Sequence, residues 1–335
     1  MKHILGAVLA GVVGVLSIQA AQATELRQVK LAEVIRSQFY VPMYVAITNG
    51  YVAEEGLEVE MITANGGDRV GALLLSGGAD FGLSGPEVPI YIYNGESPDK
   101  PRIFSALTAT DGFYLVSRDP VEDFDWSMLN GTSILGWRPG STPQLYLEYV
   151  LKKHEIDAAT IDGVITNIGP QARDGAWLSG TGEFGIFTEP SLSRLESEGD
   201  VHVIASIGTE VGRADYTVFF AQESWLEENG DVAQSWTNAI SKAQNWMETA
   251  SDAEIATALA PFFPGMTEED NLSVVQRYRN NAEPIWAENT LVSTEGLSKV
   301  QEIMTIGGVL PADEQVDYDT IVDTSYSDRA EAATN

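Results

Sequence analysis

The chain has 335 residues, a formal net charge of −30 at pH 7 and no cysteine. The negative charge excludes nucleic acid and anionic membranes as partners, because the phosphate groups would be repelled. The missing cysteine excludes disulfides, thiolate metal sites, cysteine nucleophiles and a lipidated N-terminal cysteine.

The first residues have the pattern of a secretory signal peptide. Lys2 supplies the positive charge, residues 4–16 are apolar and uncharged, and Ala21-Gln22-Ala23 is a small-residue cleavage site. The apolar run is shorter than the roughly 20 residues of a membrane span, although an uncleaved anchor is the alternative. We expect residues 1–23 to be removed, which leaves a protein free in the periplasm.

The chain after the signal peptide exceeds the usual size of one domain and predicts two lobes. Short strands alternate with helices, which is typical of a mostly parallel sheet covered on both faces. Pro42 and the apolar spacing after it predict a helix that ends at Asn49-Gly50. The first lobe is expected to contain strands 31–35, 57–62, 79–83 and 103–107 and helices 41–47, 69–75 and 88–93.

A second unit follows from about residue 111. Its expected elements are strands 112–117, 133–136, 164–166 and 184–187 and a helix over 144–153. From Trp225 the pattern becomes largely helical, and the polar tail after Ser325 is expected to be loose. The expected helices of this part are 232–250, 252–262, 268–287 and 294–306.

Ligands of parallel α/β sheets bind beyond the carboxyl ends of the strands, so the loops there are the candidate site. The sharpest feature is the turn Gly140-Ser141-Thr142-Pro143. Proline in a first helical turn leaves backbone N–H donors free beside two hydroxyls, which suits an anion or a carbonyl oxygen. The alternative is a plain N-cap, in which Ser141 or Thr142 satisfies its own helix.

Three carboxylates also follow predicted strands. Glu189 lies between an apolar strand and a proline, where it could accept hydrogen bonds from an amino group, or remain a solvated surface residue. Glu87 and Asp215 have the same two interpretations.

Aromatic and basic residues complete the candidate loops. Phe39, Tyr40 and Trp137 could stack on a planar ligand or cation, or could pack between the lobes. Arg138 and Arg69 are the best cationic candidates for an anionic ligand, and Arg69 is equally plausible as a solvated residue of a first helical turn.

The histidines argue against an enzyme. His3 leaves with the signal peptide, and neither His154 nor His202 has a nucleophile motif or metal-ligand spacing around it. His154 near a helix C-terminus is in a favourable position for the helix dipole. We expect no catalytic residue, no metal site and no cofactor.

Four stretches carry a resemblance to a known family: Pro42 to Val59, Gly66 to Phe81, Gly140 to Leu151 and the turn Phe187-Thr188-Glu189-Pro190. In them the chain resembles the SsuA/THI5-like, or NMT1-like, periplasmic solute-binding proteins of ABC importers for nitrate, sulfonates, taurine and thiamine precursors. The likeness covers roughly residues 27–220. The cysteine-rich iron motif of the family's fungal enzymes is missing here.

This resemblance implies a type II periplasmic-binding fold with a cleft between two α/β lobes and two hinge crossovers, near Thr108 to Gly112 and Ile207 to Asp215. Lobe one would comprise residues 24–110 and 209–335, and lobe two residues 111–208. The expected ligand contacts are Phe39, Tyr40, Ser84, Glu87, Trp137, Ser141, Thr142, Thr188, Glu189 and Asp215.

The expected function is capture of a small molecule and its delivery, by a monomer, to an ABC permease of the inner membrane with its cytoplasmic ATPase. The carboxylates and aromatics favour a nitrogen heterocycle such as a thiamine-precursor pyrimidine. The acidic turn at Glu87 fits a sulfonate or nitrate site poorly unless its side chain turns outward. A sulfonate, taurine or nitrate-type anion remains the alternative, as does a sensory protein that presents its ligand to a membrane receptor.

Overall fold

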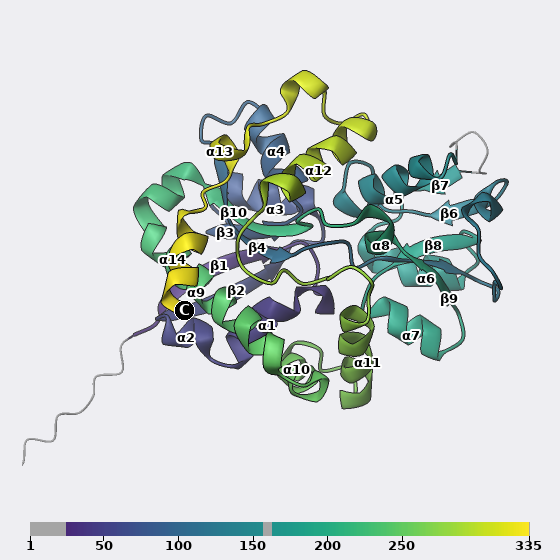
Figure 1. The fold of residues 1–335 in the computed structure, drawn as a ribbon, viewed down its shortest axis with the longest axis horizontal. Helices are drawn as coiled ribbons and strands as arrows, with labels where there is room; N and C mark the ends of the chain where they lie inside the picture. The colour runs from purple at the N-terminus through teal and green to yellow at the C-terminus, as the bar shows by residue number, and fades with distance from the viewer. Residues whose placement is uncertain (1–24, 157–162, 335) are drawn as a thin grey trace, which may run out of the picture.

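The computed structural model describes residues 25–156 and 163–334, so the predicted signal peptide lies outside the described residues. Two five-stranded sheets form two lobes that lie side by side (Figure 1). The type II periplasmic-binding architecture predicted from the sequence is confirmed.

The sheet of lobe one has the order β2-β1-β3-β10-β4. Strand β1 pairs in parallel with β2 and β3, whereas β10 runs antiparallel to both of its neighbours. The strands are β1 Arg27–Glu33, β2 Leu57–Thr63, β3 Phe81–Ser84, β4 Pro101–Thr108 and β10 Thr217–Gln222. The helices that follow the first three are α1 Val41–Thr48, α2 Tyr51–Glu54, α3 Gly67–Leu75 and α4 Glu87–Asn94.

The sheet of lobe two has the order β7-β6-β8-β5-β9, with β5 antiparallel to both neighbours. Its strands are β5 Tyr114–Ser117, β6 Ser133–Leu135, β7 Gly163–Ile165, β8 Phe184–Phe187 and β9 His202–Ser206. Its helices are α5 Thr142–Lys153, α6 Arg173–Leu178, α7 Ser191–Ser197 and α8 Ile207–Val211. The chain leaves lobe one after β4 and returns to it through residues 212–216 into β10.

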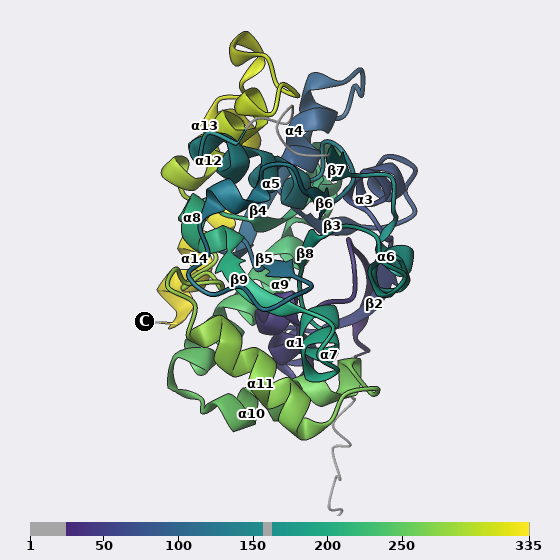
Figure 2. The ribbon, with the colours of Figure 1, turned by 90° about the vertical axis from the view of Figure 1, so that its right-hand side faces the viewer.

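The C-terminal third wraps around lobe one and reaches lobe two. Helix α9 packs on α1, α2 and α14, while α11 touches α7 and α12 touches α5 (Figures 1 and 2). The helices are α9 Glu223–Thr249, α10 Asp252–Leu259, α11 Glu268–Arg279, α12 Thr294–Ile306, α13 Tyr318–Ile321 and α14 Ser325–Thr334. Short 3₁₀ turns are Gln38–Tyr40, Trp126–Leu129, Pro170–Ala172, Ala260–Phe262 and Ala312–Glu314.

Two expectations for this third are wrong. The predicted helix 268–287 ends at Arg279, because Asn281 turns the chain by donating to the Glu283 carbonyl at 2.7 Å and Pro284 follows. The tail after Ser325 is a helix rather than loose, because it buries Tyr326 and Ala330 against the rest of lobe one. A polar composition concealed these two buried positions.

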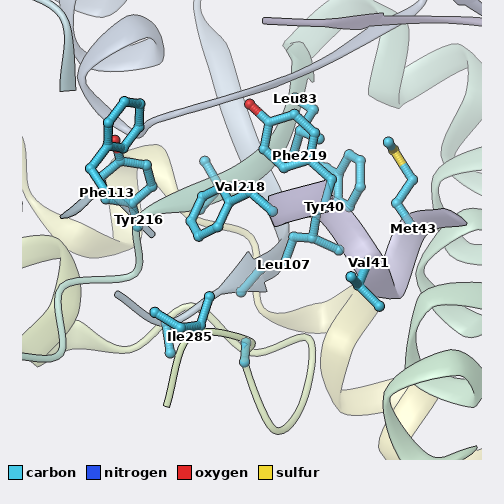
Figure 3. Close-up of a cluster of buried hydrophobic side chains, with 14 of the residues drawn as sticks. Tyr40, Val41, Met43, Leu83, Leu107, Phe113, Tyr216, Val218, Phe219 and Ile285 are labelled. Atoms are coloured by element: carbon cyan, nitrogen blue, oxygen red, sulfur yellow. The ribbon is translucent and has the colours of Figure 1, made fainter. Parts of the chain in front are cut away.

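The core of lobe one extends to the crossovers. Strand β10 contributes Val218 and Phe219 to a buried cluster that also contains Tyr40, Leu107 and Ile285 (Figure 3). The buried side chains therefore fix the loops that face lobe two. In the part of the chain that the structure describes, no helix is both long enough and apolar enough to cross a membrane.

Candidate functional site

A cavity of about 760 Å³ lies between the lobes, at the carboxyl ends of their parallel strands. Its walls are mainly apolar and aromatic, as is usual for small-molecule sites. Lobe one contributes Val34, Ile35, Ser37, Phe39, Tyr40, Gly66, Gly67, Asp68, Gly71, Ala72, Leu75, Gly85, Glu87, Val88, Tyr91, Ile92, Gly95, Glu96 and Ser97. Lobe two and the crossovers contribute Phe113, Trp137, Arg138, Pro139, Gly140, Ser141, Thr142, Pro143, Thr166, Asn167, Pro170, Thr188 and Tyr216, and strand β10 of lobe one adds Thr217.

Glu87 is the buried charged group of this cavity. It is the first residue of α4, it is 3% exposed, and its Oε2 atom has no hydrogen-bond partner among the described residues. Burial raises the pKa of its carboxyl to about 7, although the hydroxyl and N–H of Thr142 lower it in part. A buried acceptor without a partner is costly, so this oxygen is suited to a donor on a ligand.

Glu87 turns inward, toward the N-terminus of α5 on the other lobe. A Cβ atom placed on Gly85 would lie 2.0 Å from its Oε2 and 2.1 Å from the Oγ1 of Thr142, so both oxygens crowd one glycine. Ser141 does not cap α5, since its hydroxyl donates to the Arg138 carbonyl at 2.6 Å. The helix terminus that could bind an anion thus already faces a carboxylate.

Aromatic rings form the deep wall near the crossovers. Phe39 packs edge-on against Tyr216 with ring centres 5.2 Å apart, and Phe113 packs edge-on against Trp137 at 5.3 Å. The Tyr216 hydroxyl is buried and has no hydrogen-bond partner among the described residues. Phe113 and Tyr216 both belong to the buried hydrophobic cluster drawn in Figure 3. The deep wall therefore combines flat apolar surfaces with a second unpaired polar atom.

Arg173 supports Trp137 from behind. Its guanidinium carbon lies 4.2 Å from the centre of the Trp137 ring, and its N–H groups donate to the carbonyls of Leu135, Gly136 and Ile186. Burial lowers the pKa of Arg173 to about 9, so it stays charged at neutral pH. The carbonyls and the guanidinium together fix the ring that faces the cavity.

Direct bonds connect the lobes across the cavity mouth. Arg138 pairs with Asp68 at 2.9 Å and also donates to the Asn65 carbonyl at 3.1 Å. The Tyr91 hydroxyl donates to the Gly140 carbonyl at 3.0 Å. The lobes are therefore closed on each other, and Arg138 is already neutralised.

A family model confirms the resemblance, since the NMT1-like family matches residues 22–260. The chain belongs to this family. The Bacillus subtilis protein YtlA, which carries the name of a binding protein, is 38% identical over 308 residues, or 92% of this chain and 91% of YtlA. The formylaminopyrimidine-binding protein of Halalkalibacterium halodurans is 25% identical over 252 residues, which cover 71% of this chain and 73% of that protein.

Solved structures share the fold at low identity. A Bordetella bronchiseptica protein aligns with a TM-score of 0.75 and 21% identity over 93% of this chain and 99% of its own. The alkanesulfonate-binding protein SsuA of Xanthomonas axonopodis, bound to MOPS, aligns with a TM-score of 0.72 and 14% identity, over 90% of this chain and 100% of SsuA. The nitrate-binding protein NrtA of Synechocystis aligns with a TM-score of 0.71 and 18% identity, over 93% of this chain and 90% of NrtA. The family and the name of the B. subtilis relative agree with the expectation of a solute-binding protein.

Most of the residues expected at the site lie together. Seven of the expected contacts line the cavity: Phe39, Tyr40, Glu87, Trp137, Ser141, Thr142 and Thr188. Of the two candidate cations, Arg138 lines it and Arg69 does not. The loops after the strands thus converge as the topology requires.

Three expected contacts do not line the cavity. Ser84 is buried and donates to the neighbouring Gly85 carbonyl at 2.9 Å, and Asp215 accepts from the N–H and hydroxyl of Ser293 at 2.7 Å. Glu189 borders a smaller hollow of about 230 Å³ and pairs with Arg277 at 2.9 Å. Glu189 and Asp215 therefore already have partners from the C-terminal third.

Other lining residues were not expected. Tyr216 is the last residue of the second crossover. Its position next to the predicted hinge could have marked it as a cavity residue. Tyr91 and Phe113 carry no motif that would have marked them, and neither does Arg173, which supports Trp137 from behind without lining the cavity. Among residues 25–156 and 163–334, no cluster of histidine, aspartate and glutamate could hold a metal ion.

Proposed function

We propose that this protein captures a small, planar, nitrogen-bearing solute in the periplasm and delivers it to an ABC permease. The single observation that carries the proposal is the buried, unpaired Oε2 of Glu87 in an aromatic cavity. A ring amine or ring N–H would donate to this oxygen, while Tyr40 and Trp137 cover the ring faces. Ser141, Thr142 and Thr188 are further proposed contacts.

The charges along the cavity support this choice over an anion. Among the described residues that line it, Asp68, Glu87 and Glu96 are acidic and Arg138 is the one cation. Arg138 is paired with Asp68, so it offers no free positive charge. The name of the formylaminopyrimidine-binding relative points to the same ligand chemistry.

A thermal unfolding screen of residues 24–335 tests the proposal. A ligand at 100 times its Kd stabilises the native protein by about 2.7 kcal/mol, which is a measurable increase in Tm. Aminopyrimidines should raise Tm, and Glu87→Gln should abolish the increase, whereas Glu227→Gln on the outer surface should keep it. An increase with taurine, alkanesulfonates or nitrate alone would overturn the proposal and establish the anion alternative.

The anion alternative retains one supporting observation, namely the N-terminus of α5, which no side chain caps. If an anion binds there, Glu87 must accept a proton first, because the two negative charges would otherwise repel each other. Sulfonate binding would then strengthen below pH 7, whereas amine binding would weaken.

A further inference from the structure

The cavity continues beyond Glu87 along one face of α3. The lining residues of this helix are Gly67, Asp68, Gly71, Ala72 and Leu75, which recur at the spacing of a single helical face. Except for Asp68, which pairs with Arg138, this face has no polar side chain. It offers only apolar contact from Gly71 onward.

Helix α4 presents the same spacing beside it. Its lining residues are Glu87, Val88, Tyr91 and Ile92, and Gly95 follows directly after the helix. At a rise of about 1.5 Å per residue, the stretch from Glu87 to Gly95 extends about 12 Å. The two lining faces therefore run together from the buried carboxylate to the surface.

Gly71 brings the two helices close together. A Cβ atom on Gly71 would lie 3.2 Å from Ile92 Cδ1 and 3.3 Å from Val88 Cγ1, which is tighter than ordinary packing. The seam between α3 and α4 is thus a shallow apolar floor with no room for a larger residue at position 71. We call this floor, with Ala72 and Leu75, the α3–α4 groove.

The outer end of the α3–α4 groove exposes apolar surface. Leu75 is 47% exposed and Tyr91 is 37% exposed, and both line the cavity. Among the described residues, five large hydrophobic side chains are at least 36% exposed, and two of these five line this cavity. Exposed apolar side chains that gather at a cavity mark a surface that binds something.

We infer that the ligand is amphiphilic: a nitrogen-bearing planar head at Glu87 carries an apolar extension that lies in the α3–α4 groove. This inference rests on the proposed function and specifies its ligand class. A single ring at Glu87 would leave the outer half of a 760 Å³ cavity without a ligand contact. The two ends also differ in chemistry, with unpaired polar atoms at the deep end and an apolar floor toward the mouth.

A chain-length series tests the inference directly. The probes are 4-aminopyrimidines with hydrogen, ethyl, butyl or hexyl at carbon 2, and the Kd of each is measured by titration calorimetry. Burial of one CH₂ group strengthens binding about fourfold, so the butyl compound should bind at least 50-fold more tightly than the parent. A Kd that does not change with chain length overturns the inference and leaves the proposed function intact.

Two variants test where the alkyl group of the probe lies. Ala72→Phe fills the floor of the groove from an exposed helix position, so it should reduce the gain from the butyl group to less than fivefold. Leu75→Glu, also at an exposed position, should weaken the hexyl probe most. The matched control Ala53→Phe, exposed on α2 and outside the cavity, should keep the full gain.

The outcomes separate the two levels of the proposal. If affinity still increases with the length of the alkyl group in both Ala72→Phe and Leu75→Glu, the alkyl group lies elsewhere and the groove assignment is wrong. If no member of the series binds, the proposed nitrogen-bearing head group is wrong. The inference of an amphiphilic ligand is then also wrong, because it depends on that head group.

Discussion

The Glu87 carboxylate of lobe one and the Thr142 hydroxyl of lobe two meet beside a single glycine, Gly85, with no side chain between them. Each residue begins a helix, α4 or α5, so closure brings two helix N-termini to one buried carboxylate. The positive ends of both helix dipoles favour the ionised form of Glu87, while burial opposes it. This balance places a titratable group where the ligand and both lobes come together.

A methyl group at Gly85 should disrupt this contact. In Gly85→Ala, the new Cβ would lie within 2.1 Å of both oxygens, so the Glu87 carboxylate or the Thr142 hydroxyl must move and their contact across the lobes is lost. We expect the Kd for an aminopyrimidine probe to rise at least tenfold, measured by titration calorimetry. Gly175→Ala is the control, because no atom outside the adjoining chain lies within 4 Å of that added Cβ. Unchanged affinity in Gly85→Ala would contradict the contact.

Affinity for a donor ligand should depend on pH through Glu87. Its pKa is about 7 in the folded protein, so only about a tenth of the carboxyl is ionised at pH 6. The Kd of an aminopyrimidine probe should therefore fall about tenfold between pH 6 and pH 8, as titrations at intermediate pH values would show. In Glu87→Gln, binding should be weak and independent of pH between these values.

The unliganded protein should show the opposite trend in stability. Because the folded pKa of Glu87 lies above its ordinary 4.5, the folded state holds a proton that the unfolded state has lost. Stability is then full below about pH 4.5 and decreases until about pH 7. The stability difference between wild type and Glu87→Gln, from urea unfolding, should shift by about 3 kcal/mol between pH 4.5 and pH 8. A constant difference would show that Glu87 has an ordinary pKa.

The sequence predicted the fold well because the alternation of strands and helices and the family resemblance point to the same answer. It also predicted which loops form the site, since parallel strands end at one edge of a sheet. The turns that contain Glu87 and Thr142 are adjacent to their strands, so their positions follow from local patterns.

What the sequence could not provide were the partners from distant segments. Glu189 and Glu87 look alike in the sequence, because both follow a buried strand and a turn. The difference is that Arg277, from α11, pairs with Glu189, whereas no cation reaches Glu87. Asp215 is likewise bonded to Ser293, just before α12. Such pairs depend on how the C-terminal helices pack, which no local pattern encodes.

Loss of the pair between Arg138 and Asp68 should loosen the closed form. Their side chains are 27% and 67% exposed, so the pair contributes at most about 1 kcal/mol. In Asp68→Ala the Kd for the probe should rise about two- to fivefold at low salt, with little change in Tm. The control Glu54→Ala also removes an exposed carboxylate, one that pairs with Lys242 on lobe one, and should leave the Kd unchanged because Lys242 keeps its pair with Glu55. An equal effect of both variants would show that overall charge, rather than the bridge between lobes, controls affinity.

Helix α14 should contribute to stability and not to binding. Tyr326 is 6% exposed and packs edge-on against Phe104, and its backbone carbonyl accepts from Gln234 at 3.0 Å. Tyr326→Ala would leave a cavity and should lower the free energy of unfolding by about 3 kcal/mol in urea. The helix lies on the side of lobe one away from lobe two (Figure 1), so the Kd should not change.

The control for this prediction is Asp328→Ala, at an exposed position of the same helix. It should cost less than about 1 kcal/mol, because exposed substitutions remove little buried surface. A loose tail would tolerate both substitutions equally, since neither residue would then be buried. Equal and small effects would therefore show that α14 does not pack on lobe one in solution.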